Sequence, residues 1–350
     1  MSSFARRRRF PPFGISSFTE RETQPMKRNL TASLMLLLTA MVWGFSVVAQ
    51  VLGADHLPAM TFNGTRFLLG AVCLIPVYLV AEREQDLDKA ARRTRHIKTA
   101  RAALVGGCLL AVASALQQTG AGIVRDPGKT GFITGLYTVL TPVFYFLVFH
   151  RKSSWNTWVG VGLAVLGLYL LCAKGGDGPL FGEGEIFLLV GVLFWAAHIL
   201  AVDRLVGDVS VLRFSSWQFL VTGVLNLAAG LVVERGEVTA EGFRGAFGAI
   251  LFCGILSVGV GFTFQILGQK HASNPTFAAI ILSSESVFSI IGALLWNRFT
   301  PESLHVSQDI QPLGYVGCAC ILAAIVLSQL NFRSRAKTVA HSSTVHHAGK

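Results

Sequence analysis

The chain has 350 residues, of which 52% are hydrophobic and 14% are charged, and its mean hydropathy is +0.55. A soluble globular chain carries about a quarter charged residues, so this composition excludes that class and is typical of a membrane protein. The formal net charge of +11 does not indicate a nucleic-acid partner, because the Lys and Arg residues lie almost entirely between apolar runs.

The N-terminal segment 1–30 is polar and basic, with arginine at each position of 6–9. No apolar signal-peptide core precedes Leu34, so we expect disordered tails at 1–30 and 332–350. Met26 is followed by Lys27, Arg28 and an apolar run, which is typical of a natural start. We therefore expect the first 25 residues to be an extension.

The rest of the chain contains runs that are long and apolar enough to cross a membrane as helices. We predict ten of them, at 31–51, 60–81, 102–121, 131–149, 155–173, 184–203, 214–233, 246–267, 276–296 and 311–331. All six cysteines fall within these runs, without C-x-x-C pairs, and are interpreted as small packing residues.

The distribution of positive charge predicts the orientation of the spans. With the N-terminus inside, 23 Lys and Arg residues fall on inner segments and six on outer loops, while Arg66 lies within a span. The segment 82–101 alone carries seven of the inner charges. The positive-inside rule therefore predicts that both termini are cytoplasmic.

An internal repeat divides the chain into halves, which we place at 31–175 and 182–331. Residues 116–137 align without gaps on 264–285, so that Gln117 matches Gln265 and Tyr137 matches Glu285. Trp43 matches Trp195 at a similar spacing. Five spans in each half invert the second half relative to the first, which predicts an all-α membrane protein of two inverted-topology repeats with a substrate site at their interface.

Several motifs resemble the drug/metabolite transporter superfamily, specifically EamA-type permeases. They are the Trp43-Gly44 opening, Arg66-Phe-Leu-Leu, LQQTGAG…GKTGFITGLYTVLTPVF and QKHASNPTFAAIILSSESVFSIIGALL. The resemblance covers roughly 31–331 and implies a ten-helix carrier of small metabolites in the inner membrane. Two positions depart from the family pattern: Ser286 replaces the proline of S-L-E-P-V-F, and Asn297 replaces an acidic residue common at the end of this helix.

Glu285 is the acid that we expect near the membrane midplane, flanked by Ser283, Ser284 and Ser286. Ionisable groups at such a depth are costly and usually functional, so we favour a proton-coupling site or a counter-charge for a cationic substrate group. The alternative is a protonated acid that only bonds to a neighbouring helix.

Other polar and aromatic groups within the spans are further candidates. Arg66 would bind a substrate carboxylate, or else its long side chain would snorkel to the interface. For His198 a hydrogen bond to a neighbouring helix is favoured over a proton relay. The amides that could line a polar pathway are Gln117, Gln118, Gln218, Asn226 and Gln265, and the expected cavity walls are Trp43, Tyr137 and Trp195.

These features predict a secondary active transporter, which moves a small metabolite such as an amino acid across the cytoplasmic membrane, with protons as the candidate coupling ion. A channel, a lipid flippase or a non-transporting subunit are the alternatives, and a homodimer is left open. An enzyme is not expected, because no nucleophile–base pair or metal-binding motif is present in the sequence. No cofactor or metal is expected.

The charge distribution yields a topological prediction. Reporter fusions at Lys350 and within 82–101 should both give cytoplasmic signals, because these segments carry the positive charge that stays inside. A periplasmic signal from either fusion would contradict the inverted arrangement of the two halves.

Overall fold

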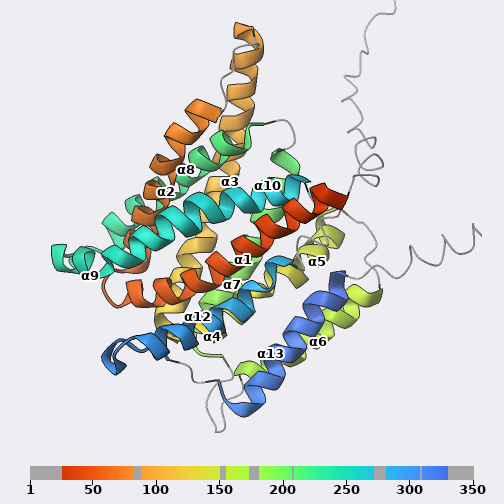
Figure 1. Ribbon diagram of the computed structural model, residues 1–350, viewed down its shortest axis with the longest axis vertical. Coiled ribbons are helices and arrows are strands. Elements are labelled where there is room, and N and C mark those ends of the chain that lie inside the picture. Colours follow the sequence, from red (N-terminus) through yellow and green to blue (C-terminus); the bar gives the residue numbers. More distant parts are fainter. Residues whose placement is uncertain are drawn as a thin grey trace, which may run out of the picture.

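The computed structural model describes residues 26–81, 88–149, 155–172, 181–206, 209–271, 281–307 and 310–329. Within these ranges the regular elements are helices, and no strand occurs (Figure 1). They are α1 (Met26–Ala54), α2 (Ala59–Ala81), α3 (Lys89–Val124), α4 (Pro127–Gly135), α5 (Tyr137–Phe149), α6 (Trp155–Cys172), α7 (Glu183–Leu205), α8 (Val211–Val233), α9 (Ala240–Leu251), the π-helix η3 (Phe252–Phe262), α10 (Thr263–His271), α12 (Glu285–Phe299), the 3-10 helix η4 (Glu302–Leu304) and α13 (Pro312–Gln329).

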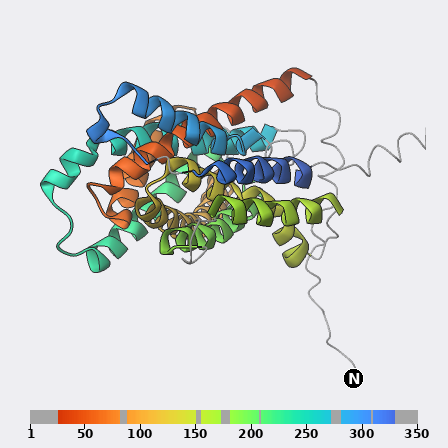
Figure 2. The same ribbon diagram turned by 90° about the horizontal axis from the view of Figure 1, so that it is seen from below.

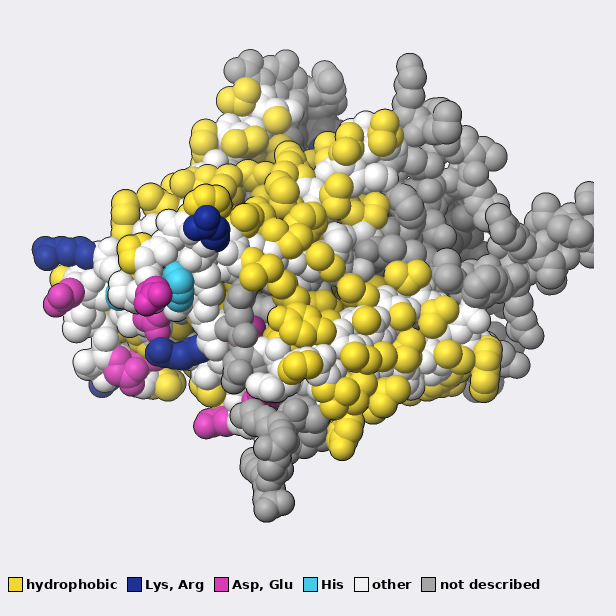
Figure 3. All heavy atoms as spheres, turned by 60° about the horizontal axis from the view of Figure 1, so that its bottom comes forward, with side chains coloured by type: hydrophobic (Ala, Val, Ile, Leu, Met, Phe, Trp, Pro, Cys, Tyr) yellow, Lys and Arg dark blue, Asp and Glu magenta, His cyan; other side chains and the backbone are white. Residues whose placement is uncertain are grey.

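Among the described residues, six helical segments are long and apolar enough to cross a membrane, and Trp158–Leu171 and Pro312–Leu327 are shorter apolar helices. The six are Leu30–Ala54, Ala59–Ala81, Lys89–Val124, Glu183–Val202, Val211–Val233 and Ala240–His271. Large apolar side chains are exposed along these helices, and Figure 3 shows them covering much of one face, with charged side chains gathered at one end. The chain is therefore a multi-pass helical membrane protein.

The runs 131–149 and 276–296 are broken, which corrects our prediction of one continuous helix in each. The first run divides at Leu136, between α4 and α5, and the second at Ser283 and Ser284, before α12. The Ser284 hydroxyl bonds to the carbonyl of Ile281 at 2.6 Å, which gives the backbone an alternative to the helix. Leu136 aligns with Ser284 in the internal repeat, so both halves break at the same place.

Other predicted boundaries also need correction. Helix α1 begins at Met26 rather than 31. The remainder of the expected tails lies outside the described residues, and so does Pro275 at the start of the predicted run 276–296. Helix α3 begins at Lys89, capped by the Asp88 side chain, so most of the basic segment predicted as a loop is helical. The run 246–267 starts earlier, at Ala240, and includes the 11-residue π-helix.

The two halves are interleaved in space. Helix α1 packs against α10, η3 and α12, α2 against α8, and α3 against α7 and α8. Helices α6 and α13 form a separate pair at one edge of the bundle, as both Figure 1 and Figure 2 show. The centre of the molecule is therefore built from helices of both halves.

Polar contacts hold several helix ends together on one side of the bundle. The exposed pair Arg125–Asp55, at 2.8 Å, joins the turn after α3 to the turn after α1. Glu234, just beyond the end of α8, accepts hydrogen bonds from the backbone N–H groups of Met60 and Thr61 at 2.6 and 2.8 Å and from the Thr61 hydroxyl at 2.7 Å. The Glu234 carboxylate lies at the N-terminus of α2, where it satisfies backbone amides that α2 leaves unpaired. It also interacts favourably with the positive end of the α2 dipole.

Replacing Glu234 by Ala should lower the thermal unfolding midpoint of the purified protein. The three hydrogen bonds to α2 are lost and buried donors are left unpaired, a loss of about 1–3 kcal/mol. Glu237→Ala is the matched control, because this nearby side chain is exposed. Equal midpoints for the two variants would show that Glu234 does not stabilise the contact between α8 and α2.

Candidate substrate site

A cavity lies in the middle of the bundle, where helices of both halves meet. The room left in it for a water-sized sphere is about 30 Å³, enough for one or two water molecules. Its lining comprises Trp43, Ser46 and Gln50 of α1, Arg66 of α2, Gln117 of α3, Thr134 of α4, Tyr137 of α5, Trp195 and Ile199 of α7, Ser257 and Phe262 of η3, Gln265 of α10 and Glu285 of α12. Seven of the eleven candidates named from the sequence thus come together here, and His198, Gln118, Gln218 and Asn226 do not.

Glu285 contributes the carboxyl group of the cavity. It is the first residue of α12, directly after the break at Ser284, and only 5% of it is exposed. The Tyr137 side chain, its repeat mate, is near enough to interact with it electrostatically. Apart from this interaction with each other, neither the Tyr137 hydroxyl nor Oε2 of Glu285 has a hydrogen-bond partner among the residues that the structure describes. A buried polar atom without a partner is costly, so this end of the cavity suits a ligand that supplies one.

Arg66 contributes the positive charge. Only 4% of the residue is exposed, so its side chain is buried in the bundle and does not snorkel to the membrane surface. Its Nε donates to Asn63 at 2.8 Å, and its guanidinium group lies 5.6 Å from the ring centroid of Phe62 and 5.1 Å from that of Phe67. No ion pair joins Arg66 to an acidic side chain in the described part of the chain. Its remaining donors are the type that binds a carboxylate or phosphate.

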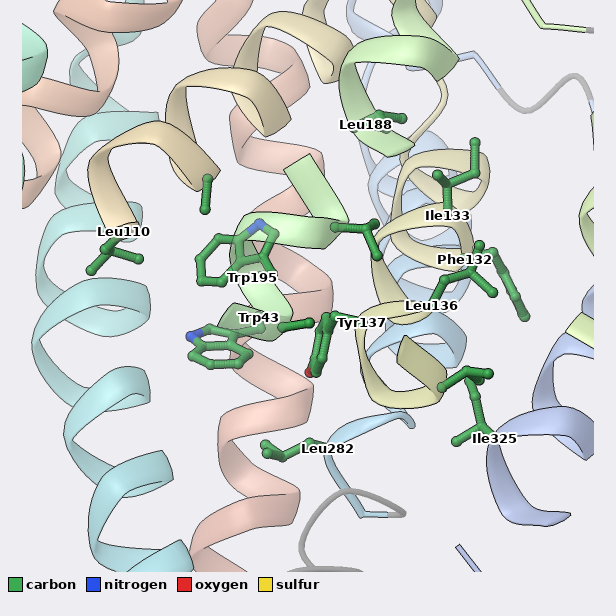
Figure 4. Close-up of a cluster of buried hydrophobic side chains, with 14 of the residues drawn as sticks. Trp43, Leu110, Phe132, Ile133, Leu136, Tyr137, Leu188, Trp195, Leu282 and Ile325 are labelled. Carbon is green, nitrogen blue, oxygen red and sulfur yellow. The ribbon is translucent and has the colours of Figure 1, made fainter. Parts of the chain in front are cut away.

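Aromatic rings form part of the cavity wall. Figure 4 shows Trp43, Trp195 and Tyr137 beside one another. The ring of Phe262 lies 4.7 Å from Trp43 and is stacked on Trp195 at 5.9 Å between centroids. The Trp43 indole N–H donates to the Ser257 carbonyl at 3.2 Å, which fixes the ring against the π-helix. Such walls would hold the apolar part of a small molecule.

The amide candidates divide into two groups. Gln117 and Gln265 line the cavity, and Oε1 of Gln265 has no hydrogen-bond partner among the described residues. The side-chain amides of Gln118 and Asn226 bond instead to the backbone of neighbouring helices. Gln118 donates to the Gln50 carbonyl at 2.8 Å, and Asn226 donates to the Ala111 carbonyl at 3.4 Å. These two amides therefore hold helices together.

His198 lies behind the cavity wall. Its Nε2 is 3.2 Å from Oε1 of Gln218 on α8, and its ring meets those of Trp195 and Phe262 edge-on. The structure thus shows the bond to a neighbouring helix that the sequence favoured for this residue. The fifth amide candidate, Gln218, is occupied in the same contact.

Six lining residues were missed from the sequence: Ser46, Gln50, Thr134, Ile199, Ser257 and Phe262. A helical signal existed for three of them. Ser46 and Gln50 follow Trp43 at three and seven residues and so share its face of α1, as Ile199 shares that of Trp195. Ser257 and Phe262 had no such signal, because the π-helix alters the spacing of side chains.

The two departures from the family motif have structural roles. Ser286 donates from its hydroxyl to the carbonyl of Gly131 at 3.1 Å, which ties α12 to α4 beside the break. Asn297 both donates to the Val306 carbonyl and accepts from its N–H, each at 2.9 Å, and a carboxylate could not do both.

Close helix contacts set the position of Glu285. A Cβ atom at Gly44 of α1 would lie 2.8 Å from the Glu285 carbonyl oxygen and closer still to Phe288. Only a glycine allows the two helices to approach this closely.

The described residues contain no group of three His, Cys, Asp or Glu side chains that could hold a metal ion.

Comparison with known proteins identifies the family. The model of the EamA-like transporter family matches residues 30–173 and again 182–328. The chain belongs to this family. It therefore falls in a class of transporters, which is not a class of enzymes.

Individual EamA relatives are distant. The chain is 24% identical over 267 residues to the uncharacterized transporter YoaV of Bacillus subtilis, covering 73% of this chain and 86% of the relative. It is 24% identical over 307 residues to an uncharacterized transporter of Archaeoglobus fulgidus, with 87% of each covered. The uncharacterized inner membrane transporter YedA of Escherichia coli is 23% identical over 223 residues, covering 60% of this chain and 68% of the relative.

A solved structure, titled only as the crystal structure of a protein, shares the fold. Its TM-score is 0.58 at 15% identity, and the match covers 86% of this chain and 96% of that one.

The close approach at Gly44 can be tested by adding one carbon atom. Gly44→Ala should lower the thermal unfolding midpoint, because the new Cβ overlaps the backbone of α12, at a cost of about 1–3 kcal/mol. Gly248→Ala is the matched control, since a Cβ there meets nothing within 4 Å and alanine is the better helix former. If Gly44→Ala were as stable as Gly248→Ala, the tight contact between α1 and α12 would be refuted.

Proposed function

We propose that this EamA-family protein is a secondary active transporter that moves a small zwitterionic metabolite, of the amino-acid type, by alternating access. The proposal rests on two ionisable groups of opposite type that line one cavity and form no ion pair with each other. They are the basic Arg66 from the first half and the acidic Glu285 from the second. Both are buried in a multi-pass membrane protein, where such groups are costly unless they have a function.

The two groups match the two ends of a zwitterion. The guanidinium group of Arg66 would bind a carboxylate, with Gln117 and Ser46 among the polar groups of the same lining. The carboxylate of Glu285 would accept hydrogen bonds from an ammonium group, next to the Tyr137 hydroxyl. Trp43, Trp195 and Phe262 would contact the carbon skeleton between them. Binding would then neutralise both buried charges at once.

The size of the cavity supports a mechanism with moving halves. Room for one or two water molecules is far too little for an amino acid, so a substrate must be admitted by a rearrangement of the helices. The cavity lies where the two halves meet, and both halves have a helix break beside it, at Leu136 and at Ser283–Ser284. Discontinuous helices at a repeat interface are the usual construction of secondary transporters.

Glu285 is the proposed coupling residue. A proton or a substrate ammonium group would each neutralise it, and neutralisation removes the cost of enclosing an unpaired ion in the closed state. Tyr137, its repeat mate, does not carry charge near neutral pH, so coupling would depend on one half alone. We place the protein in the cytoplasmic membrane, with ten spans in two inverted halves and with both termini cytoplasmic.

Substrates can be sought by thermal-shift screening of the purified protein against a metabolite library, because a ligand stabilises the folded state by mass action. Zwitterions should raise the unfolding midpoint, and Arg66→Gln should abolish the shift. A shift given only by uncharged compounds would contradict the assignment of Arg66 and Glu285.

Glu285→Gln should then separate coupling from binding. The amide keeps the shape and hydrogen bonding of a protonated acid but cannot change charge, so accumulation driven by a proton gradient should be lost. Exchange of substrate between the two sides should persist at higher substrate concentrations, because the amide oxygen loses the ion pair but still accepts a hydrogen bond from the ammonium group. Both modes would be measured in proteoliposomes at several pH values with a substrate found by the screen, and Glu241→Gln, an exposed acid at the start of α9, is the control. Undiminished accumulation by Glu285→Gln would show that Glu285 is structural.

A further inference from the structure

The repeat relates a second set of polar side chains to the set that lines the cavity. Helices α1 and α2 correspond to α7 and α8 at a spacing of 152 residues, the spacing between Trp43 and Trp195. The same spacing pairs Ser46 with His198, Asn63 with Ser215, Arg66 with Gln218 and Phe67 with Phe219. Three polar positions of the first half thus have polar mates in the second, whereas the mate of Gln50 is the apolar Val202.

The two sets are in different environments. Ser46 and Arg66 of the first set line the cavity. Their mates His198 and Gln218 face each other behind its wall, at 3.2 Å between Nε2 and Oε1. Ser215 lies one turn from Gln218 on the same face of α8.

The second set is buried and incompletely hydrogen-bonded. His198 is 1% exposed, and Gln218 and Ser215 are fully buried. Nδ1 of His198, Nε2 of Gln218 and Oγ of Ser215 have no hydrogen-bond partner anywhere in the described part of the chain. More than nine in ten buried polar groups in proteins have one, so three orphaned groups near a single side-chain contact indicate a site that another molecule completes.

Two aromatic rings of the cavity lining, those of Trp195 and Phe262, lie against His198 of this set. Phe262 contacts Trp43 and Trp195 in the cavity wall and meets the His198 ring edge-on, with centroids 6.5 Å apart. It also packs against Phe67 and Phe219, which are repeat mates of each other. Phe262 is the last residue of the π-helix, so a change in this turn would move a ring that touches both the cavity wall and the second set.

We propose that His198, Gln218 and Ser215 form a second polar site, closed in this conformation, that binds uncharged hydrogen-bonding groups when the path opens to the cytoplasm. The cytoplasmic side follows from the inversion of the second half, so this inference rests on the proposed function. The site offers an amide, a hydroxyl and an imidazole, and each of these groups can both donate and accept hydrogen bonds. The guanidinium group of the first set is replaced here by the neutral Gln218, so a carboxylate held by Arg66 finds no ion pair at the second site.

Cysteine accessibility tests the proposal without a known substrate. Ser215→Cys and, for comparison, Ser46→Cys would be made in a background whose six native cysteines are replaced by alanine, after checking that each variant keeps its thermal unfolding midpoint. A membrane-impermeant methanethiosulfonate would be applied to right-side-out and to inverted membrane vesicles. Gln218→Cys is the second probe of the site if Ser215→Cys does not fold.

Ser216→Cys is the matched control. This neighbouring serine is equally buried, but its hydroxyl donates to the Ala71 carbonyl at 3.0 Å and so faces α2 instead. Its thiol should stay unreactive from both sides.

We expect Ser215→Cys to react at least about tenfold faster from the cytoplasmic side than from the outer side, because even a minor open population exposes the site. We expect Ser46→Cys to react from the outer side. Reaction of Ser46→Cys without any reaction at position 215 would overturn the second site and leave the proposed function standing. Reaction at 215 from the outer side, or equal reaction at 216, would also overturn it. Absence of reaction at both 46 and 215 would overturn the transport path itself.

Discussion

The central constraint on this protein is the burial of a guanidinium group and a carboxyl group in one cavity of a membrane bundle. Water satisfies such groups at a surface, but in the described part of the bundle the Arg66 side chain instead contacts Asn63, the Cys253 thiol and two aromatic faces. The partner of Glu285 is the Tyr137 hydroxyl. The surrounding hydroxyl, amide and indole groups reduce the cost of burial but do not remove it. A binding site that is incomplete when empty is the physical basis of the transport function proposed for this EamA protein.

Close packing between the halves keeps the site in place. Gly44 brings α1 onto the backbone of α12 at Glu285, and Gly131 brings α4 within reach of the Ser286 hydroxyl. Polar contacts at one side of the bundle add to this, since Glu234 joins α8 to α2 and the partly buried pair Lys129–Glu185 joins α4 to α7. Because each contact joins one half to the other, the halves cannot move apart without breaking these contacts.

Symmetry and asymmetry have separate functions in this fold. Both halves break a helix at the same aligned position, at Leu136 and at Ser284, and both supply a tryptophan to the cavity wall. The charged groups break this symmetry, because Tyr137 stands opposite Glu285 and Gln218 opposite Arg66 in the alignment. The similar helix frameworks of the two halves would allow the cavity to open to each side of the membrane in turn. Their different charged residues would let the two halves bind a substrate differently.

The sequence by itself determined the membrane class, the approximate positions of the apolar helices, the internal repeat and seven residues of the cavity lining, because apolar runs and ionisable residues within them are local properties of the chain. Only the tertiary structure decided between two roles for Arg66 and placed His198 outside the cavity, since both depend on which helices surround a side chain. The helix breaks and the π-helix were also unpredicted. The bond from Ser286 to Gly131, beside one of the breaks, joins residues 155 apart in the chain, and such a contact leaves no periodic signal in either segment.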